Sequence, residues 1–388
     1  MTVSSLYPRL VQAFSNPDGQ AERLADLRGR DIVVFGPQSS LGLMHLRLLR
    51  AAGARIVLLI DDFCREPALD GVPVKSCAAF VAGAARVQEA VLVDFTVQDH
   101  TRTLCRQLAQ ASGLATCDLL TLLAAFDAPA VYQTVPDMRR LTLARADDWL
   151  ALAQRLGDDF SRETLYAILL QRLTFDRNVL RSVNIWGRDE YFGTGACSDT
   201  FRLGQAEHFV DCGAHRGTVV QKLLAATEGR YSSVHAFEPD HENFAALSWL
   251  GVTPLANFHP HRAAVSDRSE TLRFAQTGTM GSHVSQAGNV EVPALALDDV
   301  VGQATFIKMD VEGFEARCLQ GARRLLQSKP RLAIASYHYS DDLLNIVAAL
   351  DTLAPGYVLR LRHHFAYYYD TILYASRGDS WLPGADAI

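Results

Sequence analysis

One stretch of the sequence, residues 208–240, constrains the fold more than any other. It reads HFVDC, a turn that Gly213 and Gly217 bracket, a run with helical spacing, and then VHAF followed by Glu238. This order of strand, turn, helix and strand is typical of a βαβ unit. Glycines let the backbone approach a ligand, a helix start offers N–H groups to it, and an acid after the second strand can bind the hydroxyls of a ribose. The stretch therefore predicts a nucleotide site in an α/β fold.

Composition argues against several kinds of partner. The 388 residues suffice for two domains, and their net charge of −6 argues against a nucleic acid or an anionic membrane surface as the main partner. The first residues lack the pattern of a signal peptide, and no apolar run has membrane-spanning length. The seven cysteines are odd in number, scattered and never spaced as CxxC, which favours reduced thiols. We therefore expect a cytoplasmic protein.

We expect four regions along the chain. Residues 1–28 have the spacing of an amphipathic lead-in helix, and residues 29–118 alternate strands and helices as in a small Rossmann-like α/β domain. Residues 119–200 are expected to form a helical bridging region. Residues 201–388 continue in strict α/β order, with an extra hairpin around a polar loop at 277–289, and end in two strands close enough to pair antiparallel. The polar loop is either a lid or a plain flexible loop.

The first domain has a turn of its own, GPQSSLG, after its first strand. Gln38 stands where a G-x-G-x-x-G motif has its second glycine, so the close approach of the backbone to a pyrophosphate is hindered. We therefore favour a structural domain, or one that joins copies of the chain in a homo-oligomer, over a dinucleotide-binding domain. Binding of a sugar or a nucleotide sugar stays open. From residue 101 onward the spacing is helical.

Six motifs in the second half of the chain occur in a fixed order. They are DCGAHRG, HAFEPD, AVSD, FIKMDVEGFE, SYHYSDDL and the closing RHH with YDTILYA. In this order they resemble the FkbM family of S-adenosylmethionine-dependent methyltransferases, over residues 205–376 and more weakly at residues 189–192. The resemblance implies a class I methyltransferase fold, in which a seven-stranded sheet ends in an antiparallel pair.

The resemblance also implies which residues hold the cofactor S-adenosylmethionine. Asp211, Gly213 and Gly217 would form the turn along which the methionine part lies, and Glu238 would hold the ribose hydroxyls. An NAD site would share this geometry, so Glu238 alone does not distinguish the two cofactors. The full set expected at the cofactor is Asp211, Gly213, Ala214, Gly217, Glu238, Pro239, Ala264 and Asp310.

A second cluster, Lys308, Asp310 and Glu312, stands at the end of a buried strand. The strand period of two puts Lys308 and Asp310 on one face, and open α/β sheets place ligands at the carboxyl ends of their strands. Asp310 would thus lie beside the Asp211 turn and face the methyl group of the cofactor. The alternative is a buried ion pair of Lys308 with Asp310 or Glu312 that only positions the loop.

His338 ends the next strand and completes the catalytic candidates Asp310, His338 and Lys308. A histidine titrates near neutrality and could take a hydroxyl proton as the methyl group transfers. Asp310 and His338 could instead ligate a divalent metal such as Mg²⁺ that acidifies the hydroxyl. His363 and His364, one strand later, are weaker candidates, and we expect at least one of them to face solvent.

The motifs together predict an O-methyltransferase. In-line transfer of a methyl group from a sulfonium to a hydroxyl needs alignment and the removal of one proton. Acceptors in the family are hydroxyls of sugars, glycans or polyketide-like products, and the first domain favours a sugar or a nucleotide-linked sugar. Two alternatives stay open. One is a nicotinamide-dependent oxidoreductase acting on a nucleotide sugar, although the sequence lacks a G-x-G-x-x-G motif, and the other is a non-catalytic binding protein.

Overall fold

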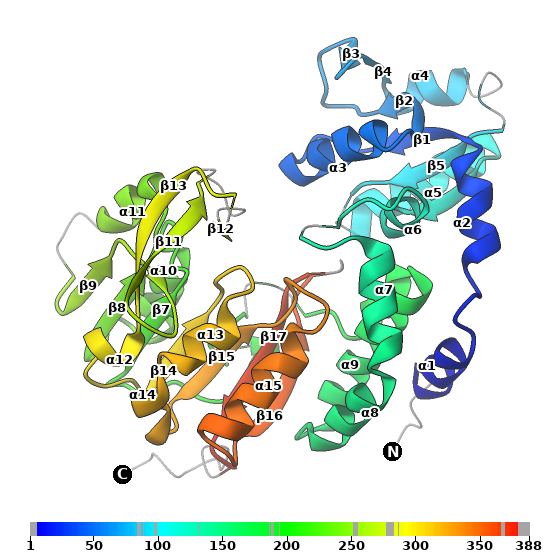
Figure 1. The fold of residues 1–388 in the computed structure, drawn as a ribbon. Helices are drawn as coiled ribbons and strands as arrows, with labels where there is room; N and C mark the ends of the chain where they lie inside the picture. Colours follow the sequence, from blue (N-terminus) through cyan, green and yellow to red (C-terminus); the bar gives the residue numbers. More distant parts are fainter. Residues whose placement is uncertain are drawn as a thin grey trace. The chain divides into compact units, whose positions relative to one another are not determined.

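The chain forms two compact units (Figure 1). The first comprises the residues up to 146 and residues 165–182, and the second comprises residues 147–164, 183–365 and those from 369 on. The computed structural model describes residues 6–83, 87, 89–96, 99–130, 132–185, 187, 190–193, 195–250, 255–276, 283–285, 287–365 and 369–378. Within these ranges, no helix is both long and apolar enough to cross a membrane.

The first unit contains a six-stranded sheet in the order β3-β4-β2-β1-β5-β6. All pairs from β4 to β6 are parallel, and only the short β3 is antiparallel to its neighbour. The parallel strands, taken in chain order, therefore stand as 3-2-1-4-5, which is the order of a Rossmann sheet. The strands are β1 (Asp31–Phe35), β2 (Arg55–Ile60), β3 (Ala68–Leu69), β4 (Val72–Lys75), β5 (Val91–Asp94) and β6 (Ala115–Asp118).

The helices of the first half depart from expectation in two places. The lead-in region holds two helices, because Pro17 cannot continue a helix and Gly19 follows it in the turn. Strand β6 lies where the spacing had indicated helix only; Gly113, at φ +73°, ends α5 and lets the chain turn into the sheet. The helices are α1 (Leu6–Ser15), α2 (Ala21–Arg28), α3 (Ser40–Ala51), α4 (Cys77–Ala82), α5 (Asp99–Ser112), α6 (Leu119–Ala125), α7 (Val135–Ala144), α8 (Ala146–Arg155) and α9 (Asp159–Thr174).

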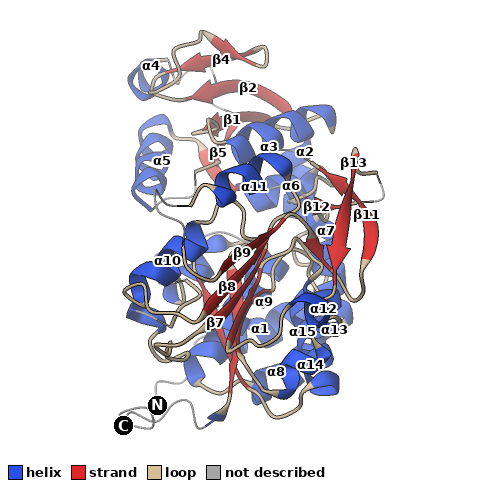
Figure 2. Cartoon of the chain, turned by 90° about the vertical axis from the view of Figure 1, so that its left-hand side faces the viewer, coloured by secondary structure: helices blue, strands red, loops and turns tan. Residues whose placement is uncertain are grey.

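The second unit confirms the predicted seven-stranded sheet, whose order is β16-β17-β15-β14-β7-β8-β9. Strand β17 is antiparallel to both β15 and β16. The run from β15 to β9 is parallel throughout. Figure 2 shows β7, β8 and β9 between α10 on one side and α12 to α15 on the other. The strands are β7 (His208–Cys212), β8 (Ser233–Phe237), β9 (Phe258–His261), β14 (Phe306–Met309), β15 (Arg331–Ala335), β16 (Val358–His363) and β17 (Thr371–Ser376).

The helices of the second unit follow the expected alternation with strands, with one break. The segment after β14 forms two short helices instead of one, because a Cβ atom on Gly321 would lie 2.1 Å from the carbonyl oxygen of Ser266. At Gly321 the backbone lies so close to Ser266 that a side chain could not fit there, and a continuous helix is interrupted. The helices are α10 (Thr218–Ala226), α11 (His241–Ser248), α12 (Leu297–Val300), α13 (Glu315–Gln320), α14 (Arg323–Gln327) and α15 (Asp342–Leu353), with 3₁₀ helices at Arg177–Ser182 and Gly195–Cys197.

A separate four-stranded sheet, in the order β10-β13-β11-β12, contains the predicted hairpin. Its strands are β10 (Ala264–Val265), β11 (Glu270–Ala275), β12 (His283–Val284) and β13 (Val290–Leu295). Strand β9 of the main sheet ends at His261, and the following Ala264 and Val265 pair with β13 instead of β8. Most of the polar loop, for which a lid and a plain flexible loop were the two expectations, lies outside the described residues, at 277–282 and 286.

Candidate functional site

The glycine turn between β7 and α10 brings the backbone against the end of β14. Gly213 has φ +79°, and a Cβ atom there would lie 1.8 Å from the carbonyl oxygen of Asp310. The N–H groups of Gly213 and Ala214 both donate to the carbonyl of Phe237, at 3.1 and 2.9 Å, so the turn is also tied to the end of β8. Gly217, at φ +85°, then starts α10. The residue type at Gly213 is thus set by sterics as well as by backbone conformation.

Glu238 follows β8 and is fastened to the same turn. Its Oε2 accepts a hydrogen bond from the N–H of His215 at 2.8 Å, and its Oε1 accepts one from the N–H of Asp240 at 2.8 Å. Burial raises the pKa of Glu238 to about 7, although both backbone bonds act in the opposite direction. Pro239, beside it, is half-buried. Each carboxylate oxygen keeps a second lone pair, so the group can still accept bonds from two neighbouring hydroxyls.

Lys308 contacts the turn, and its ion pair is with Asp211, whereas the alternative considered from the sequence named Asp310 or Glu312. Its Nζ lies 3.2 Å from Oδ1 of Asp211 and donates to the carbonyl oxygens of Gly213 at 2.7 Å and Cys212 at 3.3 Å. Burial alone would lower the pKa of Lys308, but the carboxylates of Asp211 and Asp310 raise it. The ion pair with Asp211 is fully buried and joins β14 to β7. Lys308 thereby holds the two carbonyls at the start of the turn.

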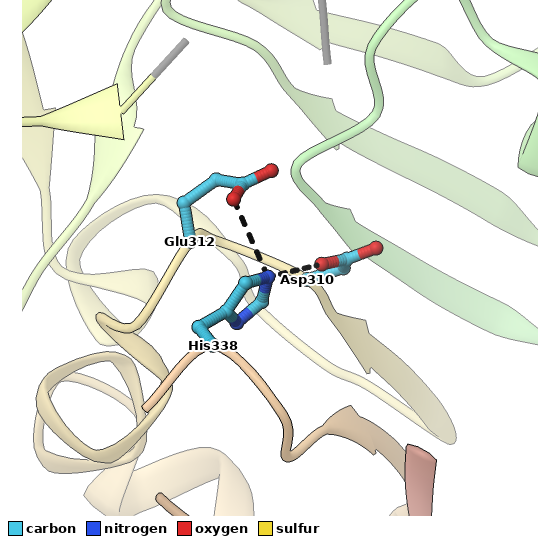
Figure 3. A group of neighbouring side chains, drawn as sticks. All are labelled: Asp310, Glu312 and His338. Atoms are coloured by element: carbon cyan, nitrogen blue, oxygen red, sulfur yellow. Dashed lines mark ion pairs between the residues drawn. The ribbon is translucent and has the colours of Figure 1, made fainter. Parts of the chain in front are cut away.

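Asp310 and His338 meet at the carboxyl ends of β14 and β15 (Figure 3). Nε2 of His338 lies 3.3 Å from Oδ1 of Asp310 and 3.4 Å from Oε2 of Glu312, and its Nδ1 lies 3.2 Å from Oε1 of Glu315. Although burial favours the neutral ring, the carboxylate of Glu315 and the bond to Asp310 raise the pKa of His338 well above its usual value. The surrounding carboxylates therefore favour the imidazolium form of His338.

The other side of Asp310 is held by two tyrosines. The hydroxyl of Tyr191 donates to Oδ2 at 3.0 Å, and that of Tyr337 donates to Oδ1 at 3.5 Å. Burial would raise the pKa of Asp310, but the bond to His338 and the charge of Lys308 hold it below its usual range. Asp310 is thus an ionised carboxylate with a fixed orientation.

Sequence reasoning missed two acids that share this site. Burial raises the pKa of Glu190 to about 8 and that of Asp370 to about 7, and in both cases the nearby carboxylates, Asp310 among them, add to the effect. Glu190 precedes Tyr191 in a segment where the family resemblance is weak, and Asp370 precedes the last strand. Spacing could not show that these segments converge on Asp310, because neither belongs to a βα unit.

The remaining candidates lie in strands β10 and β16 or directly after β16. Ala264 is buried in β10, where it pairs with β13 beyond the end of β9. The expectation that His363 or His364 faces solvent is wrong, since both are buried. Residues 184–185 pair along the edge of β16 and cover it, with the N–H of Ile185 donating to the carbonyl of His363 at 2.8 Å. His363 contacts the Thr371 hydroxyl at 2.9 Å, as expected of a structural histidine.

Comparison with known proteins agrees with this geometry. The structure superimposes with a TM-score of 0.80 on the crystal structure of methyltransferase FkbM from Methylobacillus flagellatus KT, at 24% identity over 96% of this chain and 99% of that chain, which shows a shared fold. The CurJ carbon methyltransferase aligns with a TM-score of 0.30 at 10% identity over 96% of each chain. No curated protein matches the sequence.

Residues 211–358 match the family model of the methyltransferase FkbM domain, from the buried aspartate of the glycine turn to the first residue of β16. Within the second unit, this stretch is therefore similar to the methyltransferase FkbM domain.

Proposed function

We propose that this protein transfers a methyl group from S-adenosylmethionine to a hydroxyl of a sugar, a glycan or a related natural product. The observation that carries the proposal is the contact between the Asp310–His338 pair and the glycine turn. A cofactor lying along that turn would present its methyl group beside a fixed carboxylate and an imidazole. Alignment and proton removal are the two requirements of methyl transfer to oxygen.

The cofactor would be held by the ends of three strands. Asp211, Gly213, Ala214 and Gly217 would line the methionine part, while Glu238 would accept hydrogen bonds from the ribose hydroxyls. The raised pKa of Glu238 supports this role, because a carboxyl that is desolvated without a cation partner is suited to neutral hydroxyl donors. Asp310 would lie on the methyl side, and we assign Lys308 to positioning the turn instead of to the proton transfer.

The proton of the acceptor hydroxyl would pass to the Asp310–His338 pair. In the free protein His338 carries a proton that its carboxylate neighbours favour. A sulfonium cation bound beside the pair would repel the imidazolium and lower its pKa, which would free Nε2 to act as the base. Glu315, whose Oε1 lies 3.2 Å from Nδ1 of His338, would keep a proton on that nitrogen and so orient the ring.

A divalent metal is the alternative role for the same atoms. Asp310, Glu312 and His338 each offer one ligand atom, and these atoms lie within 4.8 Å of one another (Figure 3). Two carboxylate oxygens and one imidazole fit Mg²⁺ or Mn²⁺ as a partial ligand set, with the remaining positions open to water or substrate. When bound, such an ion would acidify the acceptor hydroxyl. His338 would then be neutral, and the three side chains would serve to hold the ion.

Titration calorimetry with S-adenosylhomocysteine and with NAD tests the proposal. We expect micromolar binding of S-adenosylhomocysteine, and at least tenfold weaker binding by Glu238→Gln, because an amide cannot accept hydrogen bonds with both of its atoms. The matched control is Glu242→Gln, since Glu242 is an exposed acid on α11. Binding of NAD by a protein that gives no signal with S-adenosylhomocysteine would refute the methyltransferase proposal in favour of an oxidoreductase.

A further inference from the structure

Three histidines lie together at the edge of the seven-stranded sheet, outside the site described above. His235 is in β8, and His259 and His261 are in β9, the strand at the end of the sheet order. In the parallel register His235 stands opposite His259, and Phe237 stands opposite His261. Because side chains two residues apart in a strand share a face, His259 and His261 flank His235 on one face of the sheet.

The imidazole rings are in direct contact. Nδ1 of His235 lies 3.1 Å from Nε2 of His261. The ring centroid of His235 lies 4.7 Å from that of His259 and 5.3 Å from that of His261. The ring of Phe237 stacks on that of His261, with the two centroids 4.4 Å apart. His259 is exposed, whereas His235 and His261 are half-buried. The cluster is therefore open to an ion from solvent on the side of His259.

These rings have the charge state that metal ligands need. Burial lowers the pKa of His235 to about 4, and the neighbouring rings of His259 and His261 lower it further in the same direction. Burial, with the ring of His259, also lowers the pKa of His261. Both rings are consequently neutral at neutral pH, so each has a nitrogen lone pair to offer.

The spacing of the two nitrogens also suits a shared ion. Zinc binds imidazole nitrogen at about 2.0–2.1 Å, so two nitrogens on one tetrahedral or octahedral ion are separated by about 3.0–3.4 Å. The 3.1 Å between Nδ1 of His235 and Nε2 of His261 falls in this range. Without an ion the same spacing accommodates one N–H···N hydrogen bond. An ion would take the place of that hydrogen, which would move to the other nitrogen of its ring, so that no proton is lost.

We propose that His235, His259 and His261 form a binding site for a divalent transition metal ion, with Zn²⁺ as the probe. The ring of His259 now stacks on that of His235, with centroids 4.7 Å apart, and would have to turn to bring a nitrogen to the ion as third ligand. Three imidazoles favour Zn²⁺, Ni²⁺ or Cu²⁺ over Mg²⁺, which prefers oxygen ligands. The site would join the edge strand β9 to β8, whose end carries Glu238. It is independent of the Asp310–His338 cluster in both ligand type and position in the sheet.

Calorimetric titration of the full-length, untagged chain with ZnCl₂ tests the proposal. We expect His261→Gln to weaken the binding of one zinc ion at least tenfold, and His259→Gln to weaken it to a similar extent. His338→Gln separates this site from the carboxylate cluster and should leave the binding event intact. His100→Gln, which replaces an exposed histidine on α5, controls for adventitious binding to a surface imidazole.

A zinc isotherm that stays the same in His261→Gln and His259→Gln would overturn the proposal, as would the absence of zinc binding by the wild-type chain. If His261→Gln does not fold, the exposed His259 still decides the question, since its ring can be removed without opening the core. Loss of zinc binding in His338→Gln alone would assign the ion to the other cluster. None of these results depends on whether the chain transfers methyl groups.

Discussion

At the residue scale, the site is defined by which charged groups meet. Sequence spacing placed Lys308 and Asp310 on one face of a strand and left open a buried ion pair of Lys308 with Asp310 or Glu312. In the structure Lys308 instead lies 3.2 Å from Asp211, on the neighbouring strand β7. The identity of the candidates could be predicted because each follows or ends an apolar run. The pairing of Lys308 with Asp211 could not be predicted, because it depends on β14 lying next to β7 in the sheet, and local spacing does not encode the order of strands.

Substitution of His338 should lower the rate of methyl transfer without changing the affinity for the cofactor. We expect His338→Gln to lower kcat at least 100-fold, since the base or metal ligand is lost, while the affinity for S-adenosylhomocysteine changes less than threefold. Acceptors would first be found by screening sugars and glycans with radiolabelled S-adenosylmethionine. The control is His241→Gln, which replaces an exposed histidine on α11. A variant with near-normal kcat would return His338 to a structural role.

Lys308 should contribute to stability through Asp211. Replacing it by methionine keeps its length but leaves the buried carboxylate of Asp211 without its cation, which costs about 3–5 kcal/mol in comparable buried pairs. We expect that loss in the free energy of unfolding measured with urea. The double variant Asp211→Leu with Lys308→Met removes both charges and should recover part of it. A change below about 1 kcal/mol in Lys308→Met would show that the pair is not a buried ion pair in solution.

At the scale of elements, the sequence predicted well where a strand, a turn and a helix are encoded by neighbouring residues. The βαβ unit from His208 to Phe237 and the final antiparallel pair are both confirmed. Elements set by distant contacts were missed. Strand β6 is only four residues long and exists because β5 offers it an edge, and the break at Gly321 exists because Ser266 stands next to it.

The turn at Gly213 should be intolerant of any side chain. Gly213→Ala would need a positive φ and would displace Asp310, so we expect a loss of at least about 3 kcal/mol in the free energy of unfolding and loss of cofactor binding. Gly229→Ala is the matched control: that glycine has φ +73° but no heavy atom within 4 Å of the added Cβ. It should lose only about 1–2 kcal/mol. Equal losses in the two variants would mean that backbone conformation alone, and not the contact with Asp310, fixes the residue at 213.

At the scale of the whole molecule, the division of the chain into two units depends on long-range contacts, which local sequence patterns do not predict. The chain passes from one unit to the other within α9, since residues 147–164 belong to the second unit and residues 165–182 to the first. Helical spacing can indicate that α9 exists but not which core each part of it joins. The same holds for the acids around Asp310, which come from segments before β7, after β14 and before β17. Their convergence is a property of the folded second unit.

Because these acids are buried together, the stability of the folded chain should fall as the pH rises. Burial raises the pKa of Glu190 to about 8 and those of Glu238 and Asp370 to about 7, whereas unfolded carboxyls titrate near 4. The folded chain therefore holds protons that the unfolded chain has released. The raised pKa of His338 acts in the same direction. Stability must then fall as the pH rises through the folded-state values, because the unfolded state binds fewer protons.

We expect the free energy of unfolding to fall between pH 6.5 and 8.5. His45 and His235 have pKa values lowered to about 4, and those of His215 and His261 are lowered too, so these rings oppose the fall at pH 6.5, where unfolded histidine is about half protonated, and cease to do so about one pH unit higher. Glu190→Gln removes one of the titrating groups and should flatten the slope by up to about 1.4 kcal/mol per pH unit. Urea unfolding at pH 6.5, 7.5 and 8.5 measures it, with the exposed Glu228→Gln as the control. A wild-type stability that rises with pH in this window would mean that the carboxyls around Asp310 are not desolvated together, and that the site is open to water in the absence of a ligand.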